Sequence, residues 1–216
     1  MEMKGKNISI GQNVVIYPGT IIEDNVIIQD GAVIGKQPKT LASSTLKLQE
    51  RGPVTIGEGS LIGTNAIIYA GTTIGKEVIV SDAAIVREGC VLGEKVRVGK
   101  NAIVEFDVIL SKGVRIQAGA LIGEKTTIGE NTFIGPHVSM ALDKYMLRLP
   151  ANILDKITIG SNSAIGENSS ILPGITIGDN IIIGAGSVIS KPVTSQGIYV
   201  GNPLRKVRNL KESELK

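Results

Sequence analysis

The chain contains a single histidine, His137, within the stretch TFIGPHVSMALDKY. At neutral pH an imidazole is available to accept a proton, which suits it to general-base chemistry. A base of this kind is needed wherever an attacking amine or hydroxyl group must lose a proton. Asp143 could orient the imidazole or could be an ordinary surface charge. His137 itself could be a turn residue, since histidine is enriched at positive φ.

Further polar candidates occupy the position directly after the repeated aliphatic residue, which is usually glycine. Between residues 69 and 117 this position holds Tyr69, Ser81, Arg87, Glu105, Ser111 and Gln117. Such a run indicates a surface that binds a substrate, and a subunit interface explains it equally well. We name Glu105 and Gln117 as candidate substrate-binding residues. Asn101 joins them because it lies 36 residues before His137, in the same column of the repeat described next.

A repeat of six residues must position these side chains. An aliphatic residue recurs every six positions from Ile10 to Ile34, from Ile56 to Met140 and from Ile159 to Ile189. This period fits neither a helix nor a simple alternating strand and is typical of a solenoid. Glycine or asparagine three places after many of these residues predicts a turn at positive φ. Three six-residue sides close a triangular coil of 18 residues, and successive coils stack as parallel strands about 4.8 Å apart.

Two insertions interrupt the repeat. We expect an all-β parallel β-helix of about nine triangular coils over residues 1–190, with extruded loops at about 36–54 and 141–157 and a short helical tail at 191–216. Counting in hexads places Ile34, Met140 and Ile189 on the same side of the triangle. Both loops and the tail should therefore leave from one vertex, with the loops about 24 Å apart along the axis.

Composition narrows the function. The 216 residues include 27 Gly, no Trp and only 3% aromatic residues, which predicts a thin, regular core. A net charge of +3 without interleaved aromatic and basic residues argues against a nucleic-acid partner. No signal peptide or membrane span is evident, so we expect a cytoplasmic protein. Cys90 falls at a small-residue position and is predicted to be buried. One histidine and one buried cysteine cannot supply a zinc site, so no metal is expected.

The motifs resemble a known family. Hexads of the form aliphatic-Gly-x-x-small-x, over roughly residues 8–208, resemble the left-handed parallel β-helix of the hexapeptide-repeat acyltransferases. The segments ILPGITIG, IGAGSVISKPV and YVGNPLRKVR are similar to the closing segment of members that use acetyl-coenzyme A. TFIGPHVSMALDKY is similar to a segment of the branch that acetylates amino groups on nucleotide-linked sugars. It departs from that branch at His137, which replaces Asn, and where Ala141-Leu142 and Met146-Leu147 replace Thr-Asn and Pro-Arg.

The resemblance implies a left-handed coil, an acetyl-coenzyme A co-substrate and a homotrimer with active sites in the clefts between subunits. It implies that basic residues near the C-terminus hold the coenzyme phosphates and that backbone groups of the last coils hold the pantetheine. The acceptor would be a nucleotide-activated amino sugar. An O-acetyltransferase acting on a sugar or another small hydroxyl acceptor, and a non-catalytic scaffold, remain alternatives. The positions in this chain that match the coenzyme site are Ala164, Gly184, Ala185, Lys191, Arg205 and Lys206.

Overall fold

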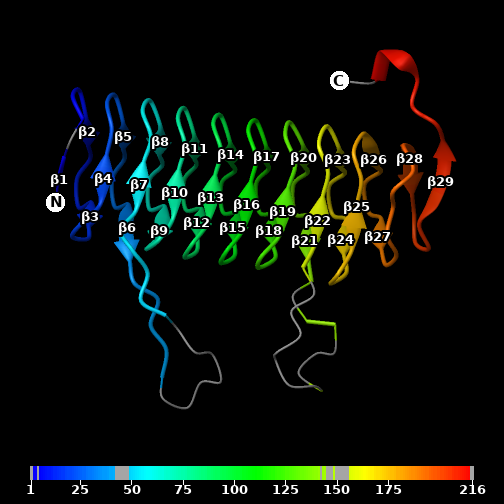
Figure 1. Ribbon diagram of the computed structural model, residues 1–216, viewed down its shortest axis with the longest axis horizontal. Helices are drawn as coiled ribbons and strands as arrows, with labels where there is room; N and C mark the ends of the chain where they lie inside the picture. Colours follow the sequence, from blue (N-terminus) through cyan, green and yellow to red (C-terminus); the bar gives the residue numbers. More distant parts are fainter. Residues whose placement is uncertain are drawn as a thin grey trace.

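The computed structural model describes residues 2–3, 5–41, 49–141, 143–144, 148 and 156–214. In this part of the chain, short strands form three sheets that wind into a solenoid of about ten turns (Figure 1). The strands repeat in the order of the three sheets, so each coil contributes one strand to each side of the prism. This is the architecture that the six-residue period predicts.

The sheets are called A, B and C, and every pairing between solenoid coils is parallel. Sheet A contains β1 (Glu2–Met3), β4 (Ile21–Ile22), β7 (Thr55–Ile56), β10 (Thr73–Ile74), β13 (Val91–Leu92), β16 (Ile109–Leu110), β19 (Thr127–Ile128), β22 (Thr158–Ile159) and β25 (Thr176–Ile177). Sheet B contains β2 (Ser9–Ile10), β5 (Ile27–Ile28), β8 (Leu61–Ile62), β11 (Ile79–Val80), β14 (Arg97–Val98), β17 (Arg115–Ile116), β20 (Phe133–Ile134), β23 (Ala164–Ile165), β26 (Ile181–Ile183), β28 (Gly197–Val200) and β29 (Arg205–Arg208). Sheet C contains β3 (Val15–Ile16), β6 (Val33–Lys36), β9 (Ile67–Tyr69), β12 (Ile85–Val86), β15 (Ile103–Val104), β18 (Leu121–Ile122), β21 (Ser139–Met140), β24 (Ser170–Ile171) and β27 (Val188–Ile189).

The repeated aliphatic residues fill the inside of the prism. From Ile22 onward they are 0–1% exposed, and they stack on their partners one coil away. Small residues complete the interior at the corners, where hydroxyl groups bond to the backbone. For example, Thr72 Oγ1 donates to the carbonyl oxygen of Arg87 at 2.9 Å, and Ser60 Oγ donates to that of Gly75 at 2.9 Å. The core is thus a narrow aliphatic column without large rings, as the composition predicts.

Turns at positive φ form three edges along the prism. Each edge is named by the two sheets it joins in chain order, so the B–C edge connects each strand of sheet B to the next strand of sheet C. Asn25 on the A–B edge has φ 58°, and Asn101 on the B–C edge has φ 55°. Asparagine tolerates this conformation better than most residues, which explains why it recurs at the corners.

Both insertions leave the solenoid at the C–A edge, which confirms the prediction from the hexad count. β6 and β21 precede the insertions and both belong to sheet C, as does β27 before the tail. Figure 1 shows the chain extending from the same side of the solenoid after β6 and after β21. Residues 42–48 of the first loop and most of the second loop lie outside the described residues. One edge therefore carries both insertions.

The C-terminal tail differs from the expected helix. Sheet B continues beyond residue 190 through β28, which is parallel to β26, and β29 then turns back antiparallel to β28. In the described part of the tail, helix is limited to one 3₁₀ turn, η1 (Glu212–Glu214), whose Glu214 accepts two hydrogen bonds of 2.7 Å from Arg208. The open end of sheet B offers unpaired backbone groups to β29, and strand pairing satisfies them. Among the described residues no helix has the length and apolar character needed to cross a membrane.

Candidate functional site

His137 lies on the B–C edge, in the turn between β20 and β21. Its φ is 54°, its side chain is exposed, and its N–H donates to the carbonyl oxygen of Ala118 at 3.0 Å. It is therefore a turn residue, and its exposed imidazole is free to meet a ligand. The two interpretations of His137 from the sequence do not exclude each other.

Gly119 sets the position of the imidazole. It occupies the same corner one coil earlier, and a Cβ added there would lie 2.5 Å from Cε1 and Nδ1 of His137. The ring thus lies in the space that the missing side chain leaves. Asn168 and Gly186 continue the column after His137, with φ values of 55° and 67°. The imidazole therefore lies along the B–C edge between a corner without a side chain, Gly119, and the corner of Asn168.

The structure separates the remaining candidates into two groups. Asn101 and Gln117 lie on the B–C edge with His137, in preceding coils. Glu105 follows β15 and Asp143 follows β21, so both lie on the C–A edge. His137 and Asp143 therefore sit at opposite ends of β21 rather than at one corner. Asp143 instead lines a pocket with the tail, described below.

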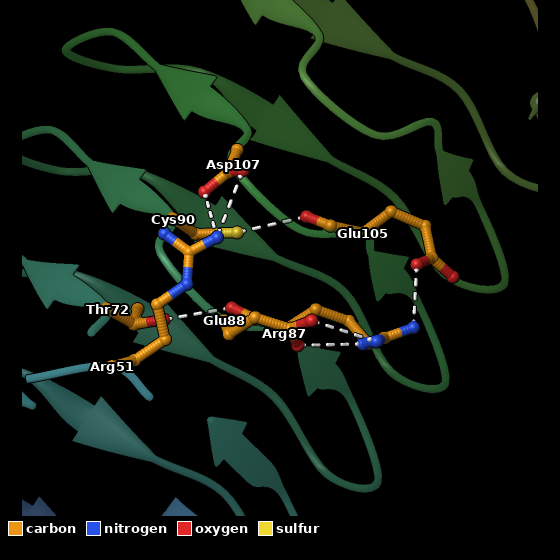
Figure 2. Close-up of polar contacts among 7 residues, drawn as sticks. All are labelled: Arg51, Thr72, Arg87, Glu88, Cys90, Glu105 and Asp107. Carbon is orange, nitrogen blue, oxygen red and sulfur yellow. Dashed lines mark hydrogen bonds and ion pairs between the residues drawn. The ribbon is translucent and has the colours of Figure 1, made fainter. Parts of the chain in front are cut away.

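The C–A edge carries a cluster of charged side chains around Arg87 (Figure 2). The guanidinium donates to both carboxylate oxygens of Glu88 at 3.0 Å and to Oε2 of Glu105 at 3.1 Å. The rings of Tyr69 and Phe106 each lie with their centroid 5.7 Å from its Cζ. Burial disfavours the charged guanidinium, but the hydrogen bond and charge of Glu88 and the charge of Glu105 outweigh it and raise the pKa of Arg87.

Glu105 is therefore a partner of Arg87 in this structure. Burial raises the pKa of its carboxyl group, and the positive charge of Arg87 opposes that rise. Its neighbour in sequence, Asp107, forms an ion pair of 3.0 Å with Arg51 from the end of the first loop. The substrate role of Glu105 expected from the sequence remains a proposal, because the carboxylate already has a partner.

Arg51 fastens the first loop to the solenoid. Gln37 joins the two ends of the loop, since its Nε2 donates to the carbonyl oxygen of Arg51 at 2.7 Å and its Oε1 accepts from the Arg51 N–H at 3.2 Å. The Arg51 side chain then runs over Gly71 and Gly89 to reach Asp107. Both glycines have positive φ and no side chain to obstruct the path. The base of the loop is thus tied to three successive coils.

Cys90 is buried in the same region, as its position in the repeat predicts. Its Sγ lies 3.0 Å from the carbonyl oxygen of Glu105, and burial raises the pKa of the thiol to about 12.

Because the thiolate is the reactive form, we expect Cys90 of the folded protein to react very slowly with a disulfide reagent at pH 8. The reagent should release one equivalent of its own thiol per chain only after guanidinium chloride has unfolded the protein. Rapid labelling of the native protein would contradict this prediction.

Two adjoining pockets lie where the tail meets the last coils. The first, of about 400 Å³, is lined by residues 190–195 together with Tyr199, Pro203, Leu204 and Lys206. Lys191 and Lys206 thus line one pocket, called the basic pocket here. Nζ of Lys206 donates to Ser195 Oγ at 3.0 Å and lies 5.8 Å from the Tyr199 ring centroid. The second, of about 660 Å³, shares Ser190 and Pro192 with the first and is lined mainly by apolar residues around Leu172 and Ile175.

The other predicted cofactor residues lie elsewhere on the last coils. Gly184 and Ala185 form the B–C corner after β26, on the same edge as His137. Arg205 is exposed on β29, opposite Val200, and does not line the basic pocket. Ala164 faces outward from sheet B. The structure therefore groups Lys191 with Lys206, and Gly184 and Ala185 with His137.

A third pocket was not anticipated. It has a volume of about 420 Å³, lies on the outer face of sheet B, and is called the sheet B pocket here. Sequence reasoning had named only Ala164 among its residues, although a spacing of 18 marks Arg97, Arg115 and Phe133 as neighbours on one face. Its lining consists of Gly113, Arg115, Asn131, Phe133, Asn162 and Ala164.

Metal-binding side chains do not gather in the described part of the chain. No three or more of its His, Cys, Asp and Glu residues lie close enough together to hold an ion. Among the described residues His137 offers a proton acceptor, the corners offer backbone N–H groups, and Lys191 and Lys206 offer positive charge.

Family models match the coils of the solenoid. Residues 5–36 and 156–191 match the bacterial transferase hexapeptide (six repeats), and residues 53–81 match the hexapeptide repeat of succinyl-transferase. The matched coils, over residues 5–36, 53–81 and 156–191, therefore carry hexapeptide repeats of the kind that these transferase models describe. This confirms the resemblance to the hexapeptide-repeat acyltransferases that the sequence motifs indicated.

Individual proteins agree with these matches. A proposed acetyltransferase of Bacillus subtilis (strain 168), YvoF, is 29% identical over 91 residues, which are 42% of this chain and 52% of that protein. The chain spans about half the length of the curated relatives it matches. A maltose O-acetyltransferase from Clostridium difficile 630 is 28% identical, with a TM-score of 0.51, over 56% of this chain and 70% of its own.

The overall fold has a closer counterpart. A UDP-N-acetylglucosamine acyltransferase from Campylobacter jejuni superposes with a TM-score of 0.64 over 98% of this chain and 78% of its own, at 16% identity. At that identity the likeness concerns the fold alone. The solenoid is thus a left-handed β-helix, as the sequence resemblance predicted.

Proposed function

We propose that the protein transfers an acetyl or another short acyl group from coenzyme A to an amino group of a nucleotide-linked amino sugar. The observation that carries this proposal is His137, an exposed imidazole on a corner of a transferase-type hexapeptide solenoid. It shares its edge with the glycine-rich corner of Gly184 and Ala185, two coils further on. The basic pocket closes the same end of the molecule.

The amine nitrogen of the acceptor attacks the thioester carbonyl, the new C–N bond forms, and the C–S bond breaks. His137 accepts the proton that the amine loses and passes it to the departing coenzyme sulfur, which leaves as a thiol. N–H groups of the corners near Gly184 and Ala185 would stabilise the oxyanion. Asp143, at the other end of β21, would act only on groups that reach the C–A edge.

Basic side chains support coenzyme A as the donor. Its phosphates need cationic partners, and Lys191 and Lys206 line one pocket of about 400 Å³. Arg205 would add charge from β29. In this assignment Asn101 and Gln117 contact the acceptor from the B–C edge that they share with His137, and Glu105 would contact it only through groups that reach the C–A edge. These co-substrates are cytoplasmic metabolites, so we place the reaction in the cytoplasm.

O-Acetylation is a second candidate. It is favoured by the maltose O-acetyltransferase from Clostridium difficile 630, because the sequence identity to that protein is 28% and the identity to the Campylobacter jejuni acyltransferase is 16%. A hydroxyl group also needs a base to remove its proton, so His137 would have the same role. A non-catalytic scaffold is less consistent with the basic pocket and with the relatives.

Release of free thiol from acetyl-coenzyme A tests the proposal. The purified protein is incubated with nucleotide-linked amino sugars, and in parallel with the corresponding hydroxyl sugars and maltose. Turnover that requires an amino sugar supports N-acetylation, and turnover with the hydroxyl sugars alone replaces it with O-acetylation. Absence of turnover with every acceptor would refute the proposed activity.

We also propose that three copies assemble through sheet C. Its outer face presents an unbroken apolar row in register across six coils, which spans about 24 Å. An apolar row of this length is unusual on an exposed face. Packing there would place the B–C edge, and with it His137, in a cleft between subunits. The row consists of Val15, Val33, Ile67, Ile85, Ile103 and Leu121.

Light scattering tests the assembly. We expect the native protein to have three times its chain mass of 22.7 kDa. The double variant Ile85→Glu/Ile103→Glu should run as a monomer, because burying two carboxylates in an apolar interface is unfavourable. Thr73→Glu on the outer face of sheet A is the matched control and should remain a trimer. A monomeric native protein, or a double variant that stays trimeric, would contradict this assignment.

A further inference from the structure

Two arginines stand one above the other on the outer face of sheet B. Arg97 and Arg115 are direct partners in the parallel ladder, so their side chains project from the same face one coil apart. Both are exposed, and among the described residues neither guanidinium has a hydrogen-bond or ion-pair partner. Like charges opposed on adjacent strands repel each other. An anion bound between the two guanidinium groups would attract both and offset their mutual repulsion.

An aromatic ring follows the arginines in the same row. Phe133 is the partner of Arg115 in the next coil, and Ala164 is the partner of Phe133 in the coil after that. The small side chain of Ala164 leaves space beside the Phe133 ring, and this space belongs to the sheet B pocket of about 420 Å³. A half-buried ring beside an open space is a stacking surface for another flat ring.

Two amides border the same pocket. Asn131 and Asn162 lie at successive A–B corners, with φ values of 55° and 54°. Asn131 extends over Gly113, where an added Cβ would lie 2.5 Å from its Oδ1. Each amide offers both donors and an acceptor. The pocket therefore combines a cationic end, an aromatic wall and a border that can form hydrogen bonds in both directions.

We propose that the sheet B pocket binds a nucleoside diphosphate. The base stacks on Phe133, the diphosphate pairs with Arg115 and Arg97, and Asn131 and Asn162 contact the base or the ribose. Guanidinium groups match phosphate oxygens in a bidentate geometry, and every nucleobase has a face that can stack on an aromatic ring. This inference rests on the proposed function, because it assigns the site to the nucleotide half of the acceptor.

The position of the pocket fits that assignment. Alternate residues of a strand face outward, so Gln117 follows Arg115 on the same face and leads to the B–C edge. Gln117 lies beside Gly135, because its N–H bonds to the carbonyl oxygen of Ile134 at 2.9 Å. His137 follows Phe133 by four positions, which span at most about 13 Å of extended chain. A sugar attached to the diphosphate would therefore reach toward Gln117 and His137.

Calorimetric titration with UDP and with GDP tests the site without any acyl transfer. We expect both nucleotides to bind, and Arg115→Ala and Phe133→Ala each to weaken binding by about tenfold or more. Leu61→Ala, on the same face in β8, and Arg208→Ala, which removes an equal charge from β29, are the matched controls and should bind as the native protein does. Circular dichroism verifies that each variant is folded, which we expect because both side chains project outward.

Three results would overturn the inference: no binding of either nucleotide, equal binding by the variants, or binding of inorganic pyrophosphate as tight as that of UDP, which leaves no role for the base. The proposed function fails separately. If nucleotides bind, and the variants bind them more weakly, but no nucleotide amino sugar is acetylated, the binding site is correct and the proposed reaction is wrong. If acetylation proceeds with an unchanged KM in Arg115→Ala and Phe133→Ala, the reaction stands and this site is wrong.

Discussion

His137→Asn is expected to lower kcat for acyl transfer by more than about a hundredfold while the protein stays folded, because a general base contributes about 10² to 10⁴ in rate. Asparagine suits the corner, as Asn101 and Asn168 adopt φ 55° in the same column. The substitution therefore removes the proton acceptor and keeps the turn. The measurement is the rate of thiol release from acetyl-coenzyme A with the best acceptor, beside the thermal midpoint by circular dichroism.

The matched control changes a corner without changing the chemistry. Asn65 lies in the same column as His137, and Asn65→Ala places an alanine at a corner like that of Ala83, which has φ 55°. It should lower stability slightly, because alanine is strained at positive φ, and leave kcat unchanged. If His137→Asn keeps more than about a tenth of the native rate, His137 is a corner residue alone. The base must then be sought elsewhere on the molecule.

The periodic part of the fold was predictable because every coil repeats the same pattern of buried and corner residues. An inward aliphatic residue and a positive-φ corner in each hexad determine the three sheets, and a count of hexads puts both insertions on the C–A edge. The same count could have separated the two proposed catalytic residues. Six residues are one side of the triangle, so Asp143 must lie one corner beyond His137. A pair at one corner would need a spacing of 18.

Contacts that depend on the insertions and the tail were not predictable. Arg51 meets Asp107 across 56 residues because the first loop returns over Gly71 and Gly89, and no repeat relates these positions. The tail was expected to be helical, yet β29 pairs with β28 because that strand would otherwise end the sheet with open backbone groups. This strand pairing overrides the local helix propensity of the tail, and it brings Lys206 into the same pocket as Lys191.

The charged cluster on the C–A edge is expected to be a major contribution to stability. Arg87→Met should lower the free energy of unfolding by about 3 kcal/mol or more, because it leaves Glu88, which is 4% exposed, and half-buried Glu105 without their cation. For a chain of this length that corresponds to a fall of roughly 10 °C in the thermal midpoint. Methionine keeps contact with the rings of Tyr69 and Phe106, so the loss is electrostatic.

The dependence on pH separates this explanation from a simple packing defect. Burial raises the pKa of Glu105 and Arg87 opposes the rise, so removing Arg87 raises that pKa further. An acid whose folded pKa is raised favours folding below its unfolded pKa and loses that contribution as pH rises through the folded pKa. The deficit of Arg87→Met should therefore be larger at pH 7 than at pH 4.5.

Two companion variants complete the experiment. Arg87→Met/Glu88→Gln should recover part of the lost stability, because the most buried carboxylate no longer carries a charge. Lys76→Met, which breaks an ion pair whose side chains are 62% and 47% exposed, should change the midpoint little, because solvent already screens that pair. A deficit that is the same at both pH values would show that Arg87 stabilises the fold by packing and not by its charge. An Arg87→Met protein as stable as the native one would show that the cluster does not stabilise the fold. It would then be retained on the C–A edge for binding, and Glu105 would return as a candidate substrate contact.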